Sequence, residues 1–467
     1  MVIQMLIKKS FVLAIGQIIN KLLGIIFIII LTNNSDNTYI YTSAYLVFSI
    51  FEDLSTIGLV PATSKMVTKL KEEVAYFLYY GKRLTSFLGV IFFIIYLVML
   101  KPISILTTNY DYTAMLIAGI SLLILPRYYF NRGYVQGKME MSCSAISLIV
   151  EGSIKVIVLL LGVFIHSVVF EYLALLSIFL ANLIGNYILR FKIKNDESKK
   201  GKSYLITYFN VFLPYGMLVL FFTLYQAVDV FTLKRLLTND SDLISSAYLY
   251  QANKLIYLPV IIASSFASTL IPGLKEKKNE TVKSIFKYLT AILVIFFVLY
   301  NLFSSSIFEI LYPNNKYYII LNNLSILIFF LSFYKIELGI IHSIGNVGIM
   351  VCCTWLSFLF KYILNKMLIP IYGFVAATYS TLFCVIFCII FGLIIIHKAK
   401  IKILRYYLFY LLKYLLVSII SYIIFIYIKK IIVFDVNKVV TLILDLSLFC
   451  FIYVAVIVST ILWKFNE

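Results

Sequence analysis

The chain has 467 residues, of which 62% are hydrophobic and 13% are charged. A soluble domain carries roughly twice that share of charge, and no soluble fold of this length can cover so much apolar surface. The formal net charge of +19 would suggest nucleic acid as the partner of a soluble protein, but here the basic residues lie in short breaks between apolar runs. Composition therefore excludes a soluble globular protein and disfavours nucleic acid as a partner.

Long apolar runs recur along the chain. A spanning helix needs about 20 apolar residues, whereas a membrane β-barrel shows alternating polarity in strands of about ten residues. The runs are continuous, so we predict an all-α polytopic membrane protein with about 14 transmembrane helices. The first run holds Asn20 and Lys21 and lacks a signal-peptide cleavage site, so we expect an uncleaved span. The expected spans are 11–31, 39–61, 84–106, 113–134, 143–165, 170–190, 209–233, 247–271, 285–306, 320–344, 349–369, 372–397, 407–428 and 439–463.

Lysine and arginine are unequally distributed between the two sets of alternating breaks. One set, which includes both ends of the chain and Arg132, holds 25 of them, and the other set holds eight. The richer side of a membrane protein faces the cytoplasm. We therefore expect a multi-pass protein of the cytoplasmic membrane with both termini in the cytoplasm, where its basic loops meet lipid headgroups.

Two short patterns recur about 210 residues apart. Pro61 and Pro272 each end an apolar run that leads into a basic segment, and the segments that precede Met141 and Met350 match at nearly the same offset. The offsets predict two parallel six-span lobes followed by two further spans, an architecture typical of alternating-access transporters. Chance matches in a chain of low complexity are the alternative. The expected parts are an N-terminal lobe (1–206), a C-terminal lobe (207–397) and accessory spans (398–467).

Ionisable residues occur inside the expected spans, where a charge is costly and usually faces an internal cavity. Lys21 and Lys254 lie in spans expected to line the seam between the lobes. Two facing cations suit a diphosphate, which offers negative charge and many acceptor oxygens. Packing and lipid-facing roles are the alternatives. The substrate-binding candidates are Lys21, Lys254, Arg127, Glu52, Asp53 and Asp229.

Other interpretations apply to several intramembrane charges. Glu151 and Lys155 stand four residues apart on one helical face, so a structural ion pair is as good an interpretation as a substrate role. Asp229 and Arg127 lie near helix ends, where exposure at the interface is the alternative. The remaining charges are Lys335 and Glu337, followed by Lys361, Lys413 and Asp445, the last three explained by snorkelling or helix–helix contacts.

Motifs of enzymes and metal proteins are missing from the sequence. The segment Gly201-Lys202-Ser203 resembles the tail of an ATP-binding P-loop, but Asp196 stands where that loop requires glycine. The three histidines have no metal spacing, and the six cysteines form no CxxC pair, as expected of small buried hydrophobes. We therefore expect a protein that is not an enzyme and needs no cofactor or metal.

Four motifs stand in or beside the expected spans, at residues 20–24, 50–65, 131–151 and 250–259. Together they resemble polysaccharide exporters of the MOP (multidrug/oligosaccharidyl-lipid/polysaccharide) superfamily, a MATE-like group that includes Wzx-like flippases and relatives of the lipid II flippases. The family motif of span eight carries a cation, which corresponds to Lys254, and the span-one motif places Lys21 similarly. The likeness covers most of the chain.

The resemblance implies a V-shaped pair of six-helix lobes with a cavity for a polyprenyl-diphosphate headgroup. Dedicated lipid II flippases carry a second basic residue soon after the span-one cation, where Phe27 stands here. Their acidic residue at the end of span two is not evident near Gly58. These departures favour a capsule, O-unit or teichoic-acid-type precursor over lipid II.

The resulting hypothesis is a flippase that moves undecaprenyl-diphosphate-linked oligosaccharide outward, driven by an ion gradient or the membrane potential. Lys21 and Lys254 are expected to hold the diphosphate, while Glu52, Asp53 and Asp229 tune the cavity or couple cations. Three alternatives remain. They are the lipid II flippase of peptidoglycan synthesis, a drug–cation antiporter with an acidic cavity, and a membrane-embedded polysaccharide polymerase, which should carry a large extracytoplasmic loop.

Overall fold

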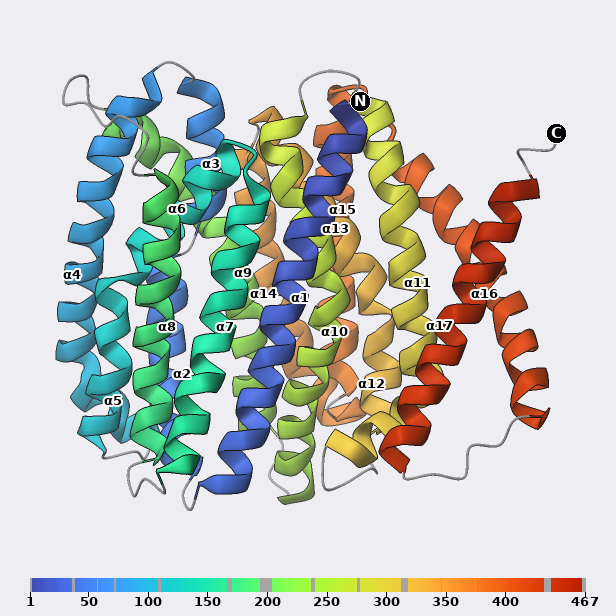
Figure 1. Cartoon of the computed structure of the whole chain (residues 1–467), viewed down its shortest axis with the longest axis horizontal. Helices are drawn as coiled ribbons and strands as arrows, with labels where there is room; N and C mark the ends of the chain where they lie inside the picture. Colours follow the sequence, from blue (N-terminus) through green and yellow to red (C-terminus); the bar gives the residue numbers. More distant parts are fainter. Residues whose placement is uncertain are drawn as a thin grey trace. The chain divides into compact units, whose positions relative to one another are not determined.

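The structure is a computed structural model of the chain, and every element in its described part is a helix (Figure 1). Each expected span coincides, to within a few residues, with one helix or with consecutive helices, so the all-α polytopic prediction is confirmed. By length and composition, 12 described segments can cross a membrane. The backbone is described for all residues except 1, 36–37, 57, 71–72, 108–110, 166–169, 194–203, 237–239, 275–277, 312–317, 346, 374, 432–437 and 464–467.

The helices follow one another with short connections. The first nine elements are α1 (Val2–Asn34), α2 (Thr38–Thr56), α3 (Leu59–Leu70), α4 (Val74–Thr107), α5 (Tyr112–Gly119), the 3-10 helix η2 (Ile120–Leu123), α6 (Leu125–Gly137), α7 (Met141–Phe164) and α8 (Phe170–Ile193). The others are α9 (Leu205–Leu236), α10 (Asp240–Gly273), α11 (Lys278–Leu311), α12 (Tyr318–Ser325), α13 (Leu327–Ile344), α14 (Val347–Tyr372), α15 (Val375–Lys398), α16 (Ile403–Ile431) and α17 (Lys438–Trp463).

Three expected spans are broken rather than continuous. Span two breaks between α2 and α3, where Gly58 has a φ of 70°, a left-handed conformation that favours glycine. Span four breaks before α6, whose first turn holds Pro126 and therefore lacks one backbone donor. Span ten breaks at Ile326, between α12 and α13. Spans four and ten, paired by the repeat, thus share a break, whereas α10, the counterpart of span two, is one helix.

The basic segment that follows Pro61 is a packed helix, α3, and not the loop that its charges predict. Its residues Ala62, Thr63, Ser64, Met66 and Val67 are buried. The side chain that Gly133 of α6 lacks would come within 2.6 Å of the Val60 carbonyl oxygen, so the two helices are in close contact. The ammonium of Lys65 donates a hydrogen bond to the carbonyl of Ser343. Packing therefore outweighs local charge in this segment.

The chain divides into two compact units. Unit 1 comprises Met1–Leu224, Ser265–Lys275 and Gly339–Thr354, and unit 2 comprises Tyr225–Ser264, Glu276–Leu338 and Trp355–Glu467. Four of the five boundaries therefore fall inside helices, namely α9, α10, α13 and α14, and the fifth lies between α10 and α11. The lobes expected from chain order stay a prediction.

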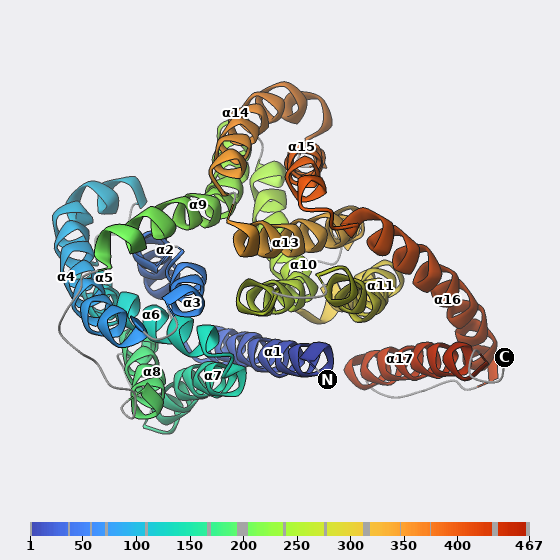
Figure 2. The ribbon, with the colours of Figure 1, turned by 90° about the horizontal axis from the view of Figure 1, so that it is seen from above.

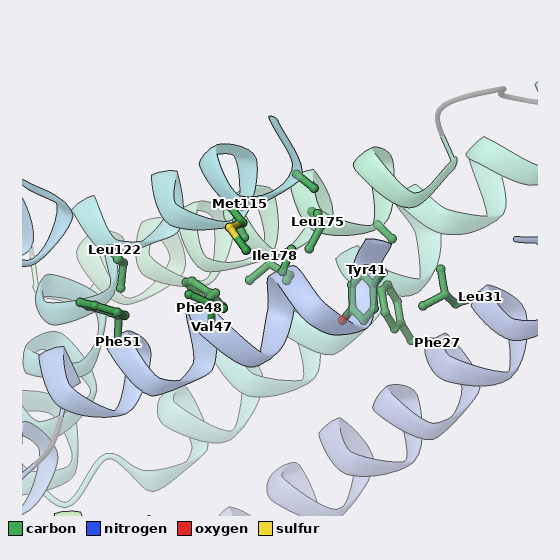
Figure 3. Packing of buried hydrophobic residues seen from close by; sticks show 14 of the residues in the cluster. Phe27, Leu31, Tyr41, Val47, Phe48, Phe51, Met115, Leu122, Leu175 and Ile178 are labelled. Carbon is green, nitrogen blue, oxygen red and sulfur yellow. The ribbon is translucent and has the colours of Figure 1, made fainter. Parts of the chain in front are cut away.

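The core of unit 1 is an apolar cluster shared by α1, α2, α5 and α8 (Figure 3). Phe27 of α1 is buried there, and its ring centroid lies 5.7 Å from that of Tyr41. Phe51 packs edge-on against Tyr96 at 5.1 Å, and the Tyr96 hydroxyl donates to the Met115 carbonyl at 2.7 Å. This core fixes the orientation of α1 and α2.

Helices α1 and α7 lie side by side in unit 1 (Figures 1 and 2). A Cβ on Gly16 of α1 would lie 2.6 Å from the Cβ of Ala145, and a Cβ on Gly152 of α7 would lie 2.5 Å from the Asn20 side-chain oxygen. Glycines at both contacts let the two backbones approach closely, as in other membrane helix pairs. The approach aligns the polar residues of the two helices.

In unit 2, the last two helices pack onto α11. Phe286 of α11 stacks on Phe333 of α13 at 5.9 Å and also contacts Tyr407 of α16. The Tyr453 hydroxyl of α17 donates to the Ala291 carbonyl at 3.2 Å. An ion pair between Lys429 and Asp445 joins α16 to α17. The two C-terminal helices are therefore part of the packed structure of unit 2.

Valine at Gly16 is expected to destabilise the protein by about 1–3 kcal/mol, because a new side chain would overpack the contact with Ala145. Valine at Gly24 is the matched control, since a Cβ there meets nothing within 4 Å. The unfolding temperatures of the two variants in detergent micelles measure the difference. Equal temperatures for both variants would contradict the close packing of α1 on α7.

Candidate functional site

Charged side chains from four helices of unit 1 act on one another electrostatically. We refer to them as the unit 1 charge cluster. They carry three positive and three negative formal charges, so the cluster as a whole is neutral. Its members are Lys21 of α1, Glu52 and Asp53 of α2, Arg132 of α6, and Glu151 and Lys155 of α7.

Glu151 is the best-connected member of the cluster. One of its carboxylate oxygens accepts from the Lys155 ammonium at 2.7 Å, and the other accepts from the Tyr128 hydroxyl at 3.1 Å. The ion pair predicted from the spacing of four residues is therefore present. Because both oxygens are engaged, Glu151 holds Lys155 in place beside the other charges.

Arg132 belongs to the cluster although its place in the sequence predicts a polar break between spans. It is buried, and its guanidinium carbon lies 5.0 Å from the Tyr129 ring centroid and 5.6 Å from that of Tyr128. Stacking on aromatic rings stabilises a desolvated cation. The spacing of four residues from Tyr128, which places both on one helical face, is the sequence signal that could have found it.

Lys21 differs from the other cations of the cluster because its side chain is exposed. No described carboxylate pairs with it within the 4.0 Å limit of an ion pair, although Glu52, Asp53 and Glu151 attract it from farther away. Its neighbour Asn20 contacts Gly152, the neighbour of Glu151, so the α1–α7 contact places Lys21 beside the cluster. Lys21 is therefore the one exposed cation of the cluster.

Glu52 and Asp53 follow the core residue Phe51 on α2. Phe51 is buried in the apolar core, so the next two residues point away from it, given the helical turn of about 100° per residue. Both are half-buried. Glu52 acts on Lys21 and on Lys155. The two carboxylates therefore balance the cations that α1 and α7 present.

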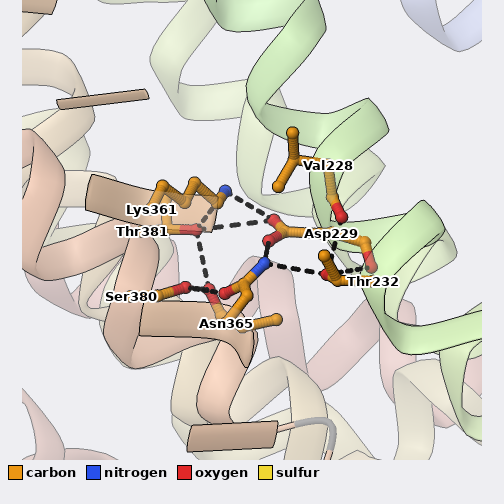
Figure 4. Close-up of polar contacts among 8 residues, drawn as sticks. Val228, Asp229, Thr232, Lys361, Asn365, Ser380 and Thr381 are labelled. Atoms are coloured by element: carbon orange, nitrogen blue, oxygen red, sulfur yellow. Dashed lines mark hydrogen bonds and ion pairs between the residues drawn. The ribbon is translucent and has the colours of Figure 1, made fainter. Parts of the chain in front are cut away.

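A second polar cluster lies in unit 2 (Figure 4). It links α9, α14 and α15, and its side chains are mostly buried. We refer to it as the unit 2 polar cluster. Its members are Asp229, Thr232, Lys361, Asn365, Ser380 and Thr381.

Every charge in the unit 2 polar cluster has partners. Lys361 donates to Asp229 at 2.7 Å and to the Thr381 hydroxyl at 2.8 Å. The Asn365 amide donates to the other Asp229 oxygen at 2.9 Å and to Thr232 at 3.0 Å. The Ser380 hydroxyl in turn donates to the Asn365 oxygen.

This arrangement has the properties of a structural link. The Lys361 side chain is 1% exposed and the Asp229 side chain 11% exposed, so a ligand has little access to either. A buried ion pair is tolerated where further hydrogen bonds satisfy both partners. The helix–helix explanation for Lys361 fits this geometry, and its partner Asp229 lies inside unit 2 and not at an exposed interface.

A family model described as polysaccharide biosynthesis protein matches residues 6–277, more than half of the chain. The chain belongs to this family. The matched region contains all six residues of the unit 1 charge cluster and also Asp229 and Lys254.

Two proteins of Bacillus subtilis (strain 168) are similar in sequence. The lipid II flippase MurJ is 27% identical over 316 residues, which span 58% of this chain and 58% of MurJ. The chain therefore matches less than two thirds of that relative. The uncharacterized membrane protein YabM is 23% identical over 80% of this chain and 76% of its own length.

Solved structures share the fold. The outward-facing conformation of a multidrug resistance MATE family transporter of the MOP superfamily has a TM-score of 0.70 at 12% identity, over 85% of this chain and 97% of that one. Lipid II flippase MurJ in an inward closed conformation has a TM-score of 0.67 at 14% identity, over 97% of this chain and 99% of that one. The fold is thus the one that MATE and MurJ transporters share, as the resemblance implied.

The structure brings together three of the six predicted substrate-binding residues, namely Lys21, Glu52 and Asp53. Arg127 lies elsewhere in unit 1, where its guanidinium donates to the Ser86 hydroxyl of α4 at 2.9 Å. The charge that acts on it is Arg190 of α8 and not a member of the charge cluster.

The other two predicted residues belong to unit 2. Asp229 forms the ion pair with Lys361 described above. The backbone of Lys254 lies within α10, but its side chain lies outside the described residues. Among the described residues, no group of three or more His, Cys, Asp or Glu side chains could hold a metal ion.

Lys361→Met is expected to destabilise unit 2 by about 3–5 kcal/mol, because it leaves the Asp229 carboxylate buried without its cation. Asp229→Asn combined with Lys361→Met should recover much of this loss, since no buried charge remains. Thermal unfolding in detergent micelles measures both effects.

Lys366→Met, at an exposed lysine of the same helix, is the matched control and should change the unfolding temperature little. If Lys361→Met changed the unfolding temperature as little as this control, the ion pair would make no contribution to stability.

Proposed function

We propose that this protein is a flippase that moves lipid-linked oligosaccharide diphosphates across the cytoplasmic membrane for the synthesis of cell-surface polysaccharide. Membership of the polysaccharide biosynthesis family supports the pathway class. The similarity to a lipid II flippase supports a lipid-linked substrate. The fold shared with MATE and MurJ transporters supports alternating access.

The observation that carries this proposal is that Lys21 is an exposed residue beside the Glu151–Lys155 ion pair. Lys155 is engaged by Glu151 at 2.7 Å, and Arg132 is buried against two tyrosine rings. Lys21 alone among the cations of the cluster is exposed and lacks an ion pair. A phosphate group recruits such an ammonium as a point charge. Lys21 is therefore proposed to bind the diphosphate of the substrate.

The acidic members of the cluster lower the affinity of the site for an anionic ligand. Glu52, Asp53 and Glu151 attract Lys21 in the absence of substrate. A diphosphate must compete with them, so its binding is weaker than it would be at an isolated cation. Transport requires binding that is strong enough to load and weak enough to release. A neutral cluster meets that requirement better than a purely basic pocket.

The apolar surroundings of Phe27 bear on the glycan. Phe27 is buried in the core of unit 1, 4% exposed, with its ring against Tyr41. This side chain lies six residues, or about 1.7 helical turns, from Lys21 and supplies no second cation. The substrate class is therefore proposed as undecaprenyl-diphosphate carriers with capsule, O-unit or teichoic-acid-type glycans, with lipid II as the competing substrate.

The membrane orientation, the division into lobes and the energy source are also part of the proposed function. Both termini are proposed to lie in the cytoplasm because the basic residues concentrate in the corresponding breaks. The lobes at 1–206 and 207–397, with accessory spans at 398–467, are proposed from the sequence repeat, and the shared break of spans four and ten supports it. An ion gradient or the membrane potential is the proposed energy source.

Lys21→Gln is expected to lower the translocation of a fluorescent undecaprenyl-diphosphate oligosaccharide in proteoliposomes at least tenfold, because the ligand loses its accessible cation. Lys8→Gln, at an exposed lysine on the same helix, is the matched control and should transport at the wild-type rate. Equal rates for the two variants would overturn the assignment of Lys21. Export of dyes coupled to a cation gradient, without movement of the lipid, would replace the flippase with a drug antiporter.

Lys254→Gln is expected to lower transport as Lys21→Gln does, if both lysines hold the same diphosphate. The effect of combining them should then be smaller than the product of the single effects, because the second loss acts on a site already emptied. The comparison uses initial rates in the same proteoliposomes. Multiplicative losses would show that the two lysines act at independent steps.

A further inference from the structure

Glu337 of α13 is a carboxylic acid side chain that neither cluster uses. It is 0% exposed. A Cβ placed on Gly392 of α15 would lie 2.4 Å from the Glu337 carboxyl carbon and 2.5 Å from one of its oxygens. The carboxyl group therefore occupies the space that the missing side chain of Gly392 leaves free. It lies about 10 Å, or seven residues, from the end of α13.

Both oxygens of this carboxyl group are buried, and neither has a hydrogen-bond partner among the described residues. Other shielded acids of the described residues do have partners, and Glu171 accepts from the Ser35 hydroxyl. Glu151 is paired with Lys155, Asp229 with Lys361, and Asp445 with Lys429. Glu337 differs from these acids, since no described charged group acts on its carboxyl.

The neighbouring elements explain why it lacks a cation. Phe333 lies one turn before Glu337, and the rings that contact it from α11 and α16 are those of Phe286 and Tyr407. On α15, the nearest titratable group toward the helix start is Cys388, whose sulfur contacts the Ser357 hydroxyl at 3.2 Å. The other titratable groups of α13 itself are Tyr334, Lys335 and His342, and these have interactions of their own.

An ionised carboxylate in such a place would have neither water nor a counter-ion, and burial of an isolated charge is far costlier than burial of a neutral acid. A metal cation would need several oxygen ligands, whereas the described residues offer none within hydrogen-bonding distance of the carboxyl. A proton needs only the carboxyl oxygen itself. The proton is therefore the ligand that this site can take.

We propose that Glu337 is a proton-binding site, which holds its proton while α13 and α15 are in contact and releases it when water reaches that contact. The neutral acid fits against the bare backbone of Gly392, and the ionised form does not. Protonation thus favours the arrangement described here over any arrangement in which water reaches the contact between α13 and α15. A proton gradient acts on the balance between the two through this differential affinity.

The coupling of this site to substrate movement rests on the proposed flippase function, whereas the binding of the proton does not. If the protein transports lipid-linked glycans, protons supplied on one side and removed on the other would drive the cycle. The coupling ion would then be the proton, bound in unit 2 at a residue remote in sequence from Lys21.

Infrared difference spectroscopy of wild type against Glu337→Gln tests proton binding without any substrate. At neutral pH the wild type should show the carbonyl stretch of a protonated carboxylic acid, and Glu337→Gln should lack that band. Glu309→Gln is the control, because Glu309 is paired with Lys438 and its loss should remove a carboxylate band. Loss of a carboxylate band in Glu337→Gln would overturn the proposal.

Labelling with dicyclohexylcarbodiimide gives a second readout, because this apolar reagent reacts with protonated acids in apolar surroundings. The acid adds across one C=N bond, its proton moves to nitrogen, and the acyl group then migrates to give a stable N-acylurea with no leaving group. Mass spectrometry should find the adduct on Glu337 and not on Glu309. Adducts on Glu309 but not on Glu337, together with a carboxylate band at Glu337, would again overturn proton binding.

Transport driven by an imposed pH gradient tests the coupling. Wild-type proteoliposomes should move the fluorescent lipid-linked glycan faster with the gradient, and Glu337→Gln should lose that stimulation. Stimulation that survives in Glu337→Gln would overturn the coupling while the infrared result still stands. Absence of transport in the wild type, with the acid band present, would overturn the flippase function and not the proton site.

Discussion

The absence of water inside the bilayer is the constraint on which the rest of the structure depends. A backbone or side-chain polar group in hydrocarbon must find its partner within the protein, so the described elements are all helices. The same constraint decides how each intramembrane charge is held. Asp229 is enclosed by Lys361 and Asn365, and Glu151 by Lys155 and Tyr128. Glu337 satisfies the constraint by neutrality and not by pairing. Lys21 is the exception, since it is exposed and no described carboxylate forms an ion pair with it, and unpaired charges inside a membrane are candidates for function.

The long apolar runs predicted the helices well because a spanning helix requires an apolar run of matching length. The breaks within spans two, four and ten could not be read from the same signal. The breaks in spans two and four lie beside single residues, Gly58 and Pro126, which change the mean hydropathy of a run little. Helix α3 was not predicted because its sequence is basic and not apolar. Its lysines favour a loop, but Lys65 finds an acceptor on Ser343 and the buried face packs on α6, so tertiary contacts override the local pattern.

The site was predictable only in part. Lys21, Glu52 and Asp53 stood out because charge within an apolar run is rare, and the spacing of Glu151 and Lys155 was enough to suggest their ion pair. Contacts between residues of different helices cannot be predicted from spacing in the sequence. Lys361 and Asp229 lie 132 residues apart, and only the packed structure brings them together. Arg127 and Arg132 illustrate the limit of the same reasoning, since five residues on one helix separate an arginine bound to a serine hydroxyl from one that stacks on tyrosine rings inside the cluster.

The ion pair between Lys429 and Asp445 has a mechanical consequence. It ties α16 and α17 into one hairpin, and Tyr407 and Tyr453 fasten that hairpin to α11 of unit 2. Much of its outer surface is apolar and exposed, with Leu412 at 62%, Leu416 at 64% and Phe451 at 74%. The acyl chains of lipids contact such a surface. A mismatch between its height and the membrane thickness costs energy for every ångström. The hairpin therefore enlarges the apolar perimeter of unit 2 on which the membrane thickness acts.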